Sequence, residues 1–235
     1  MKRSVLILGL ILFAACAVAG YVMASKSGNG STTGSSAPAN AATALAASQQ
    51  NYLLVQADDL SQPTPKFIQA WIVLTYYSNP PQIIFLPLYP SYDSSQNDAI
   101  AGAFAMTSSG RLSSRLEQKI AEQYKVKVDG TILTDASGLD AIAKDFGIAN
   151  VSASTQAAKN DDDKHAILLG SQSFFQEICA QLKAGDAAKQ FDSMQWSQLI
   201  PGHFQTDLSF EQLIASWDRV VRSAAPQQCE VLSKE

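Results

Sequence analysis

The sequence is short of positive charge and of the residues that build common active sites. Only 16% of its 235 residues are charged, and 17 Lys and Arg against 21 Asp and Glu give a formal net charge of −4. The arginines are Arg3, Arg111, Arg115, Arg219 and Arg222. Nucleic-acid binding needs clustered Lys and Arg, so this composition excludes nucleic acid as a partner. No GxSxG, HExxH, P-loop or GxGxxG sequence is present, which leaves no common catalytic signature.

Cysteine and histidine are equally scarce, with three and two residues. His165 and His203 are far apart, and no two cysteines have the CxxC spacing of a zinc site. In an oxidising compartment, Cys179 and Cys229 predict a disulfide, with two buried free thiols as the alternative. The bond would tie the C-terminal tail to a helix.

The long apolar run of the chain lies at its N-terminus. Lys2 and Arg3 precede Val5–Ala24, twenty residues without a charge, which is the length of a membrane-spanning helix. We predict an uncleaved single-pass anchor over 1–25, with a cleaved signal peptide or lipidation at Cys16 as alternatives. The basic end stays in the cytoplasm, so each interpretation places the rest of the chain on the extracytoplasmic side of the cell membrane.

Composition divides the remainder into three parts. Residues 26–50 are mainly Ser, Gly, Thr, Asn and Ala, which predicts a flexible linker. The folded domain is expected over 51–222, followed by a C-terminal tail over 223–235.

Hydrophobic periodicity predicts a domain in which helices pack against a sheet. Some segments of 51–222 have apolar residues at helical spacing, and others are runs rich in β-branched and aromatic residues. Strands are expected over 52–56, 70–77, 82–86 and 131–133, and helices over 109–124, 136–146, 171–183 and from Ser209 onward. Gln212 stands three residues after Ser209, the spacing of a capping box. The fold class is therefore α/β (α+β).

Two acidic clusters are candidates for cation binding. Asp58 and Asp59 follow the first strand, where their carboxylates could hold a divalent cation or cap a turn. Asp161–Asp163 lie in a polar stretch over 152–164, which we expect to be an exposed loop.

Six segments, in order, resemble the LytR-CpsA-Psr family of envelope proteins. They are Asn51–Asp58, Asn79-Pro80 with Ile83–Pro87, Ala103–Ala105, Thr134–Leu139, Ser171–Leu182, and Thr206–Ser209 with Leu213. The resemblance implies a central mixed sheet flanked by helices, preceded by one N-terminal transmembrane helix. It also implies transfer of a glycopolymer from a polyprenyl pyrophosphate carrier to the cell wall. In that activity arginines hold the pyrophosphate, aspartates hold magnesium, and the prenyl chain lies in an apolar channel between sheet and helices.

The departures from the family pattern fall on the charged positions. Leu88-Tyr89 stand where the family has Arg-Asp, and Trp71 or Ala70 where it has another Asp. Gly170 stands where the family has an arginine, and Ala101 where it has an asparagine. Of the family residues that hold the metal and the pyrophosphate, Asp58 is the one that remains. A buried pyrophosphate without cations would be an uncompensated charge.

These departures favour a divergent, non-catalytic member that binds a polyprenyl lipid or a cell-envelope component such as a cell-wall polymer. One alternative is an active phosphotransferase that uses Asp58, Asp59, Arg111 and Arg115 together; another is a structural or partner-binding envelope module. The candidate ligand-binding residues are Asp58, Asp59, Arg111, Arg115, Trp71 and Phe104. Asp58 is the candidate metal ligand, and Mg²⁺ is expected only if the chain is a transferase.

Overall fold

The computed structural model describes residues 49–148, 156–185, 202–221 and 225–233. The predicted anchor, Cys16 and all of the predicted linker except residues 49 and 50 lie outside these ranges. None of the helices within them combines the length and the apolar character needed to cross a membrane.

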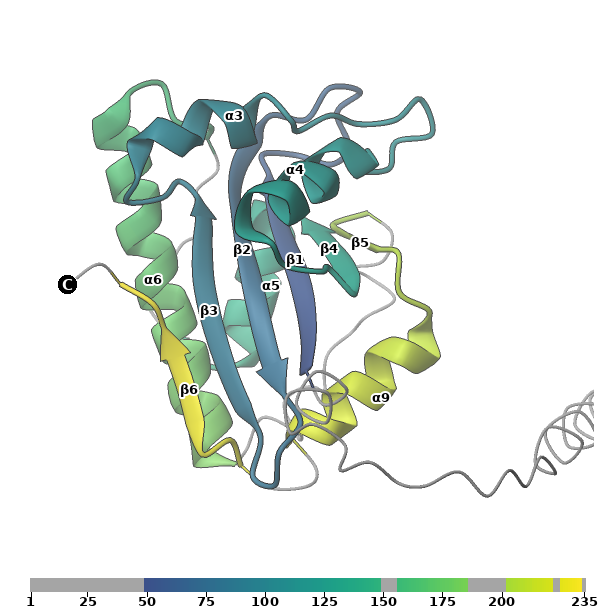
Figure 1. The fold of residues 1–235 in the computed structure, drawn as a ribbon, viewed down its shortest axis with the longest axis vertical. Coiled ribbons are helices and arrows are strands. Elements are labelled where there is room, and N and C mark those ends of the chain that lie inside the picture. Colours follow the sequence, from purple (N-terminus) through teal and green to yellow (C-terminus); the bar gives the residue numbers. More distant parts are fainter. Residues whose placement is uncertain (1–48, 149–155, 186–201, 222–224, 234–235) are drawn as a thin grey trace, which may run out of the picture. The chain divides into compact units, whose positions relative to one another are not determined.

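The described residues build a six-stranded mixed sheet (Figure 1). Its strands are β1 (Gln49–Ala57), β2 (Phe67–Tyr76), β3 (Gln82–Tyr89), β4 (Gly130–Thr134), β5 (Phe204–Thr206) and β6 (Gln228–Val231), in the order β5-β4-β1-β2-β3-β6. β1, β2 and β3 are successive antiparallel neighbours, whereas β1 pairs with β4, and β3 with β6, in parallel. β5 adds an antiparallel edge strand to β4. The prediction of a mixed sheet with flanking helices is confirmed.

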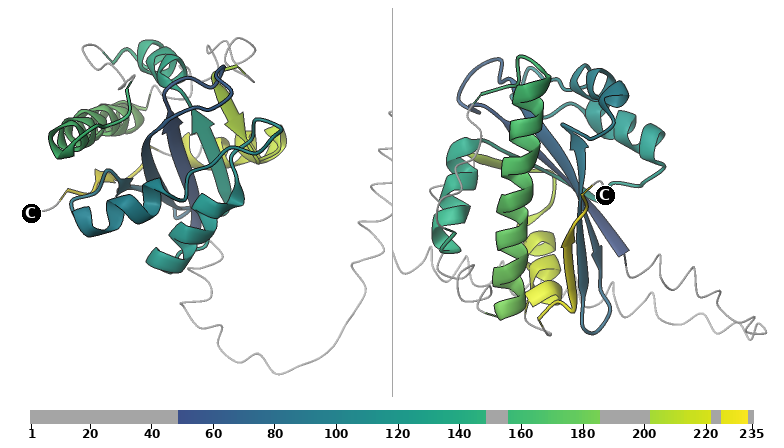
Figure 2. Two further views of the ribbon diagram at one scale, coloured as in Figure 1. Left: turned by 90° about the horizontal axis from the view of Figure 1, so that it is seen from above. Right: turned by 90° about the vertical axis from the view of Figure 1, so that its left-hand side faces the viewer.

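Helices cover both faces of this sheet (Figure 2). They are α3 (Asn97–Ala101), α4 (Ser114–Tyr124), α5 (Ala136–Asp145), α6 (Asp161–Ala184) and α9 (Phe210–Val221), with a short 3₁₀ turn at Ser94–Gln96 before α3. α3 and α4 lie on one face, and α5, α6 and α9 lie on the other.

Strand alternation divides the apolar side chains between two cores. Leu53 and Ile72 point toward α4, where they form one cluster with Leu116 and other fully buried residues. Trp71 and Phe85 point the other way and pack on Phe175 of α6, with ring centroids 4.8 and 4.6 Å from that ring. Each central strand is apolar on both faces because both faces are covered.

The prediction of an exposed loop over 152–164 is wrong at its end, because α6 already begins at Asp161. Asn160 is the N-cap, and its side chain accepts a hydrogen bond from the backbone N–H of Asp163 at 2.8 Å. The three aspartates occupy the first turn, where negative charge interacts favourably with the helix dipole. The acidic residues that we expected in an exposed loop therefore form the first turn of the helix.

The helix predicted over 109–124 begins later, at Ser114. Residues 106–112 form a tight turn closed by a bridge between Met106 and Leu112, with Gly110 at φ +73°. The Ser113 hydroxyl then accepts from the backbone N–H of Arg115 at 3.3 Å and caps α4.

Two local predictions are confirmed at the C-terminal end. Ser209 and Gln212 form the expected capping box: the Ser209 N–H donates to Gln212 Oε1 at 2.8 Å, and the Gln212 N–H to Ser209 Oγ at 3.2 Å. Cys179 of α6 and Cys229 of β6 are joined by a disulfide. The predicted tail thus contains an edge strand held to a helix.

Candidate functional site

Asp58 ends β1 and closes the loop between β1 and β2. Its Oδ1 accepts hydrogen bonds from the backbone N–H groups of Asp59 and Lys66, at 2.8 and 2.7 Å. The carboxylate thereby stabilises the loop, which is the turn-capping interpretation of the acidic pair.

Asp59 is engaged within the same loop. Its carboxylate accepts hydrogen bonds from Ser61 and Gln62, which lower the pKa of Asp59. Within the described ranges, no three His, Cys, Asp or Glu residues are grouped as metal ligands. The assignment of Asp58 to a metal site therefore stays a prediction.

Arg111 and Arg115 lie on the exposed side of the 107–113 turn and α4. Arg111 lines a polar cavity of about 340 Å³, together with Glu117 and Asp207. Burial, followed by the nearby charge of Asp207, raises the pKa of Glu117. Asp58, Asp59 and Arg115 do not line this cavity, so it does not bring the four charged candidates together.

Buried, uncharged side chains occupy the two positions at which the family pattern has Arg-Asp. Leu88 is fully buried and Tyr89 is 6% exposed. The Tyr89 ring stacks on Phe67 with centroids 4.6 Å apart, and Phe67 stacks on Phe104 at 5.0 Å. Phe104, a candidate ligand-binding residue, thus belongs to an aromatic stack on the α3 and α4 face.

Trp71 lies in the core on the opposite face and is 1% exposed. Its indole N–H donates to Gln69 Oε1 at 2.9 Å, and that oxygen also accepts from the Ser171 hydroxyl. The Gln69 amide in turn donates to Gln56. These four side chains form a buried, uncharged network at the Asp58 end of the sheet.

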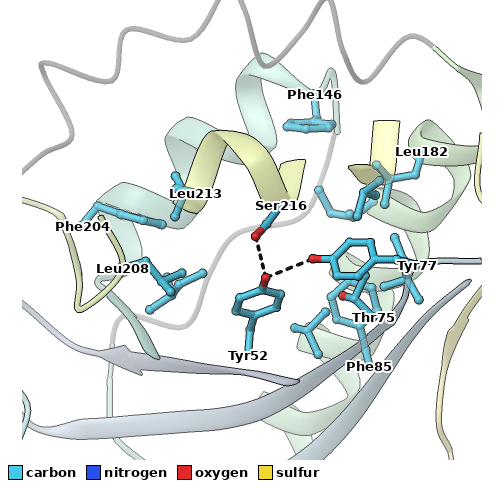
Figure 3. A pocket seen from close by; sticks show the side chains of 15 residues that line it. Tyr52, Thr75, Tyr77, Phe85, Phe146, Leu182, Phe204, Leu208, Leu213 and Ser216 are labelled. Carbon is cyan, nitrogen blue, oxygen red and sulfur yellow. Dashed lines mark hydrogen bonds between the residues drawn. The ribbon is translucent and has the colours of Figure 1, made fainter. Parts of the chain in front are cut away.

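The apolar cavity lies on the same face, between the sheet and the three helices α5, α6 and α9 (Figure 3). It has a volume of about 240 Å³. Its lining residues are Tyr52, Val73, Thr75, Tyr77, Ile83, Phe85, Ile132, Phe146, Ile178, Leu182, Phe204, Leu208, Leu213, Ser216 and Val220. None of these fifteen side chains is charged, and four carry a hydroxyl group. The lining is thus suited to hydrocarbon with a few uncharged polar contacts.

Hydroxyl groups meet in one part of the cavity wall. The Tyr52 hydroxyl lies 2.7 Å from Ser216 Oγ of α9 and 3.0 Å from the Tyr77 hydroxyl (Figure 3). Tyr77 also donates to Gln50 Oε1 at 2.8 Å. Burial is the main reason that the pKa of Tyr77 is raised, so its phenol stays neutral. Outside this cluster, the guanidinium of Arg219 lies 5.3 Å from the centre of the Tyr77 ring.

The hydroxyl cluster and Asp58 lie toward opposite ends of β1. Asp58 stands six positions after Tyr52, which is about 20 Å along a strand. The cavity therefore does not lie beside the acidic loop on which the sequence analysis concentrated. It can hold an apolar chain, but it offers no cation to a diphosphate and no group placed for phosphoryl transfer.

No family model matches the sequence, and no curated protein matches it. Among solved structures, protein gbs0355 from Streptococcus agalactiae is similar, with a TM-score of 0.52 and 10% identity over 79% of this chain and 77% of that one. TagT bound to LI-WTA has a TM-score of 0.49 and 10% identity, over 86% and 81% of the two chains. B. subtilis TagV has a TM-score of 0.47 and 8% identity, over 79% and 85%.

The domain has a LytR-CpsA-Psr-like fold. At about 10% identity the likeness concerns the fold alone. The resemblance found in the six sequence segments is thereby confirmed at the level of the fold, and the site residues must be judged from their own contacts.

Sequence reasoning missed the side chains around the cavity. Tyr52, Thr75 and Tyr77 show no recognisable motif, but the two-residue alternation of the strands places them on the face opposite Leu53 and Ile72. Ser216 comes from α9, whose contact with β1 is not encoded in any local pattern.

Proposed function

We propose that this chain is a membrane-tethered extracytoplasmic domain that holds an apolar lipid chain, of polyprenyl or similar character, and does not catalyse phosphoryl transfer. The observation that carries the proposal is the cavity of about 240 Å³, lined by apolar and hydroxyl side chains, between the sheet and α5, α6 and α9. The N-terminal run Val5–Ala24 supports the tether.

The absence of catalysis is supported by the buried, uncharged side chains at positions where the LytR-CpsA-Psr pattern has charged residues. Phosphoryl transfer depends on cations that stabilise the charge of the transition state. Leu88 and Tyr89 are packed in a core, and the face around Trp71 carries neutral amides. Placing a diphosphate among such groups would cost on the order of several kcal/mol.

A cavity-filling substitution tests chain binding. Ile178 of α6 lines the cavity, whereas Leu169 of the same helix is 47% exposed. We expect full-length protein to enhance the fluorescence of 1-aminoanthracene, Ile178→Trp to weaken binding at least tenfold, and Leu169→Trp to leave it unchanged, because only Ile178→Trp fills the space.

Equal binding by the Ile178→Trp variant would contradict the proposed site. Transfer of a lipid-linked glycopolymer by the purified protein with Mg²⁺, lost in Asp58→Ala, would contradict the proposed absence of catalysis. Mass spectrometry of lipids extracted from the protein purified from its native membrane would identify the chain itself.

A further inference from the structure

Thr75 is a polar residue that faces the apolar cavity. It is 3% exposed and lies on β2 opposite Gln50 of β1. Its hydroxyl makes no hydrogen bond to any of the described residues, yet its side chain lines the cavity (Figure 3). A hydroxyl in an apolar wall normally has a hydrogen-bond partner, so this position suits a ligand atom.

The hydroxyl cluster beside it offers further uncharged contacts. Tyr52, Tyr77 and Ser216 can each donate or accept, because a hydroxyl group has one hydrogen and two lone pairs. All three, with Thr75, belong to a wall that is otherwise hydrocarbon. The polar groups therefore form an uncharged patch within an apolar wall.

We infer that the ligand of this cavity is a lipid whose chain carries an uncharged oxygen, as a hydroxyl or an ester carbonyl, which bonds to Thr75 and the Tyr52–Tyr77–Ser216 cluster. This inference rests on the proposed function, since it names the class of chain that the same cavity holds. A pure hydrocarbon would give the Thr75 hydroxyl no partner beyond the described residues. A phosphate in the cavity would meet no cation among the fifteen lining side chains.

Arg219 is a cation that the structure places against a residue of the cavity wall. It packs on the ring of Tyr77 and is exposed, and it does not line the cavity. A charged head group held by Arg219 is thus a distinct outcome that the experiment must separate.

Three C15 compounds that share one chain provide the test. Farnesene has no oxygen, farnesol has a hydroxyl, and farnesyl phosphate has a charged head. Displacement of 1-aminoanthracene from full-length protein in amphipol measures the affinity of each. We expect farnesol to bind about fivefold more tightly than farnesene, as one net hydrogen bond implies. We expect its affinity to exceed that for farnesyl phosphate by at least the same factor.

Variants identify the groups responsible. Thr75→Val keeps the shape of the side chain and should remove most of the preference for farnesol over farnesene, with farnesene binding unchanged. Tyr52→Phe should have the same direction of effect. Thr107→Val, at an exposed threonine outside the cavity, is the matched control.

Each remaining outcome overturns the inference. Equal affinity for farnesol and farnesene would show that no oxygen is recognised. Tighter binding of farnesyl phosphate, lost in Arg219→Ala, would establish a charged head group. In both of these outcomes the cavity still binds a terpenoid chain, so the proposed function would stand, whereas absence of binding by all three terpenoids would refute both proposals.

Discussion

At the scale of single residues, Gly138 shows how tightly α5 is seated. It lies in the first turn of α5, where Asp135 accepts its N–H at 3.0 Å. A Cβ added here would lie 2.6 Å from the backbone oxygen of His203 and 2.4 Å from Thr134 Oγ1. Since the first of these atoms belongs to backbone, it has little freedom to move away.

We therefore expect Gly138→Ala to destabilise the protein by about 1–3 kcal/mol, as overpacking of a closed contact does. Gly170 of α6 is the matched control, because a Cβ there meets nothing within 4 Å and its residue is exposed. Gly170→Ala should stabilise the protein by about 0.5–1 kcal/mol through helix propensity. Urea denaturation followed by tryptophan fluorescence measures both, and equal effects of the two substitutions would contradict the contact.

At the scale of elements, α9 forms part of the cavity wall that faces the sheet. It contributes Leu213, Ser216 and Val220 to the lining, and its N-terminus is held by the capping box of Ser209 and Gln212. The position of this helix therefore affects the shape of the cavity around Ser216.

Removal of the cap should loosen α9. Ser209→Ala is expected to weaken the helix by about 1 kcal/mol, so that amide hydrogen exchange over residues 210–221 becomes about fivefold faster. Ser173→Ala in α6, where the hydroxyl donates to the Leu169 carbonyl within the helix at 3.1 Å, is the control and should leave exchange of α9 unchanged. Unaltered exchange in Ser209→Ala would show that packing alone holds α9.

At the scale of the whole molecule, the disulfide connects a long helix to an edge strand. Cys179 and Cys229 are 50 residues apart and both lie in the core on the cavity face. β6 contributes only four residues to the sheet, and the disulfide adds a covalent link between it and α6.

Closing a loop of 50 residues stabilises the folded state by about 4 kcal/mol through the entropy of the unfolded chain. We expect dithiothreitol to lower the urea midpoint of the wild-type protein, and a variant with both Cys179→Ala and Cys229→Ala to have a low midpoint that does not respond to the reductant. Cys16→Ala should keep the wild-type response. Insensitivity of the wild-type protein would mean that the thiols are not joined.

The sequence by itself determined the elements that depend on local chemistry. The apolar runs of β1, β2 and β3, the helical spacing of α5 and the capping box before α9 lie close to their predicted positions. The start of α6 was missed because three aspartates suit both an exposed loop and the first turn of a helix. β5 and β6 have three and four residues, too few for a periodic pattern.

Only the tertiary structure decided where a ligand could lie. The sequence directed attention to Asp58 and Asp59, because charge is visible without coordinates, but those carboxylates accept hydrogen bonds within their own loop. The cavity wall combines residues from Tyr52 to Val220. A hydroxyl such as that of Thr75 acquires meaning only through what surrounds it, and its surroundings come from strands and helices that are distant along the chain.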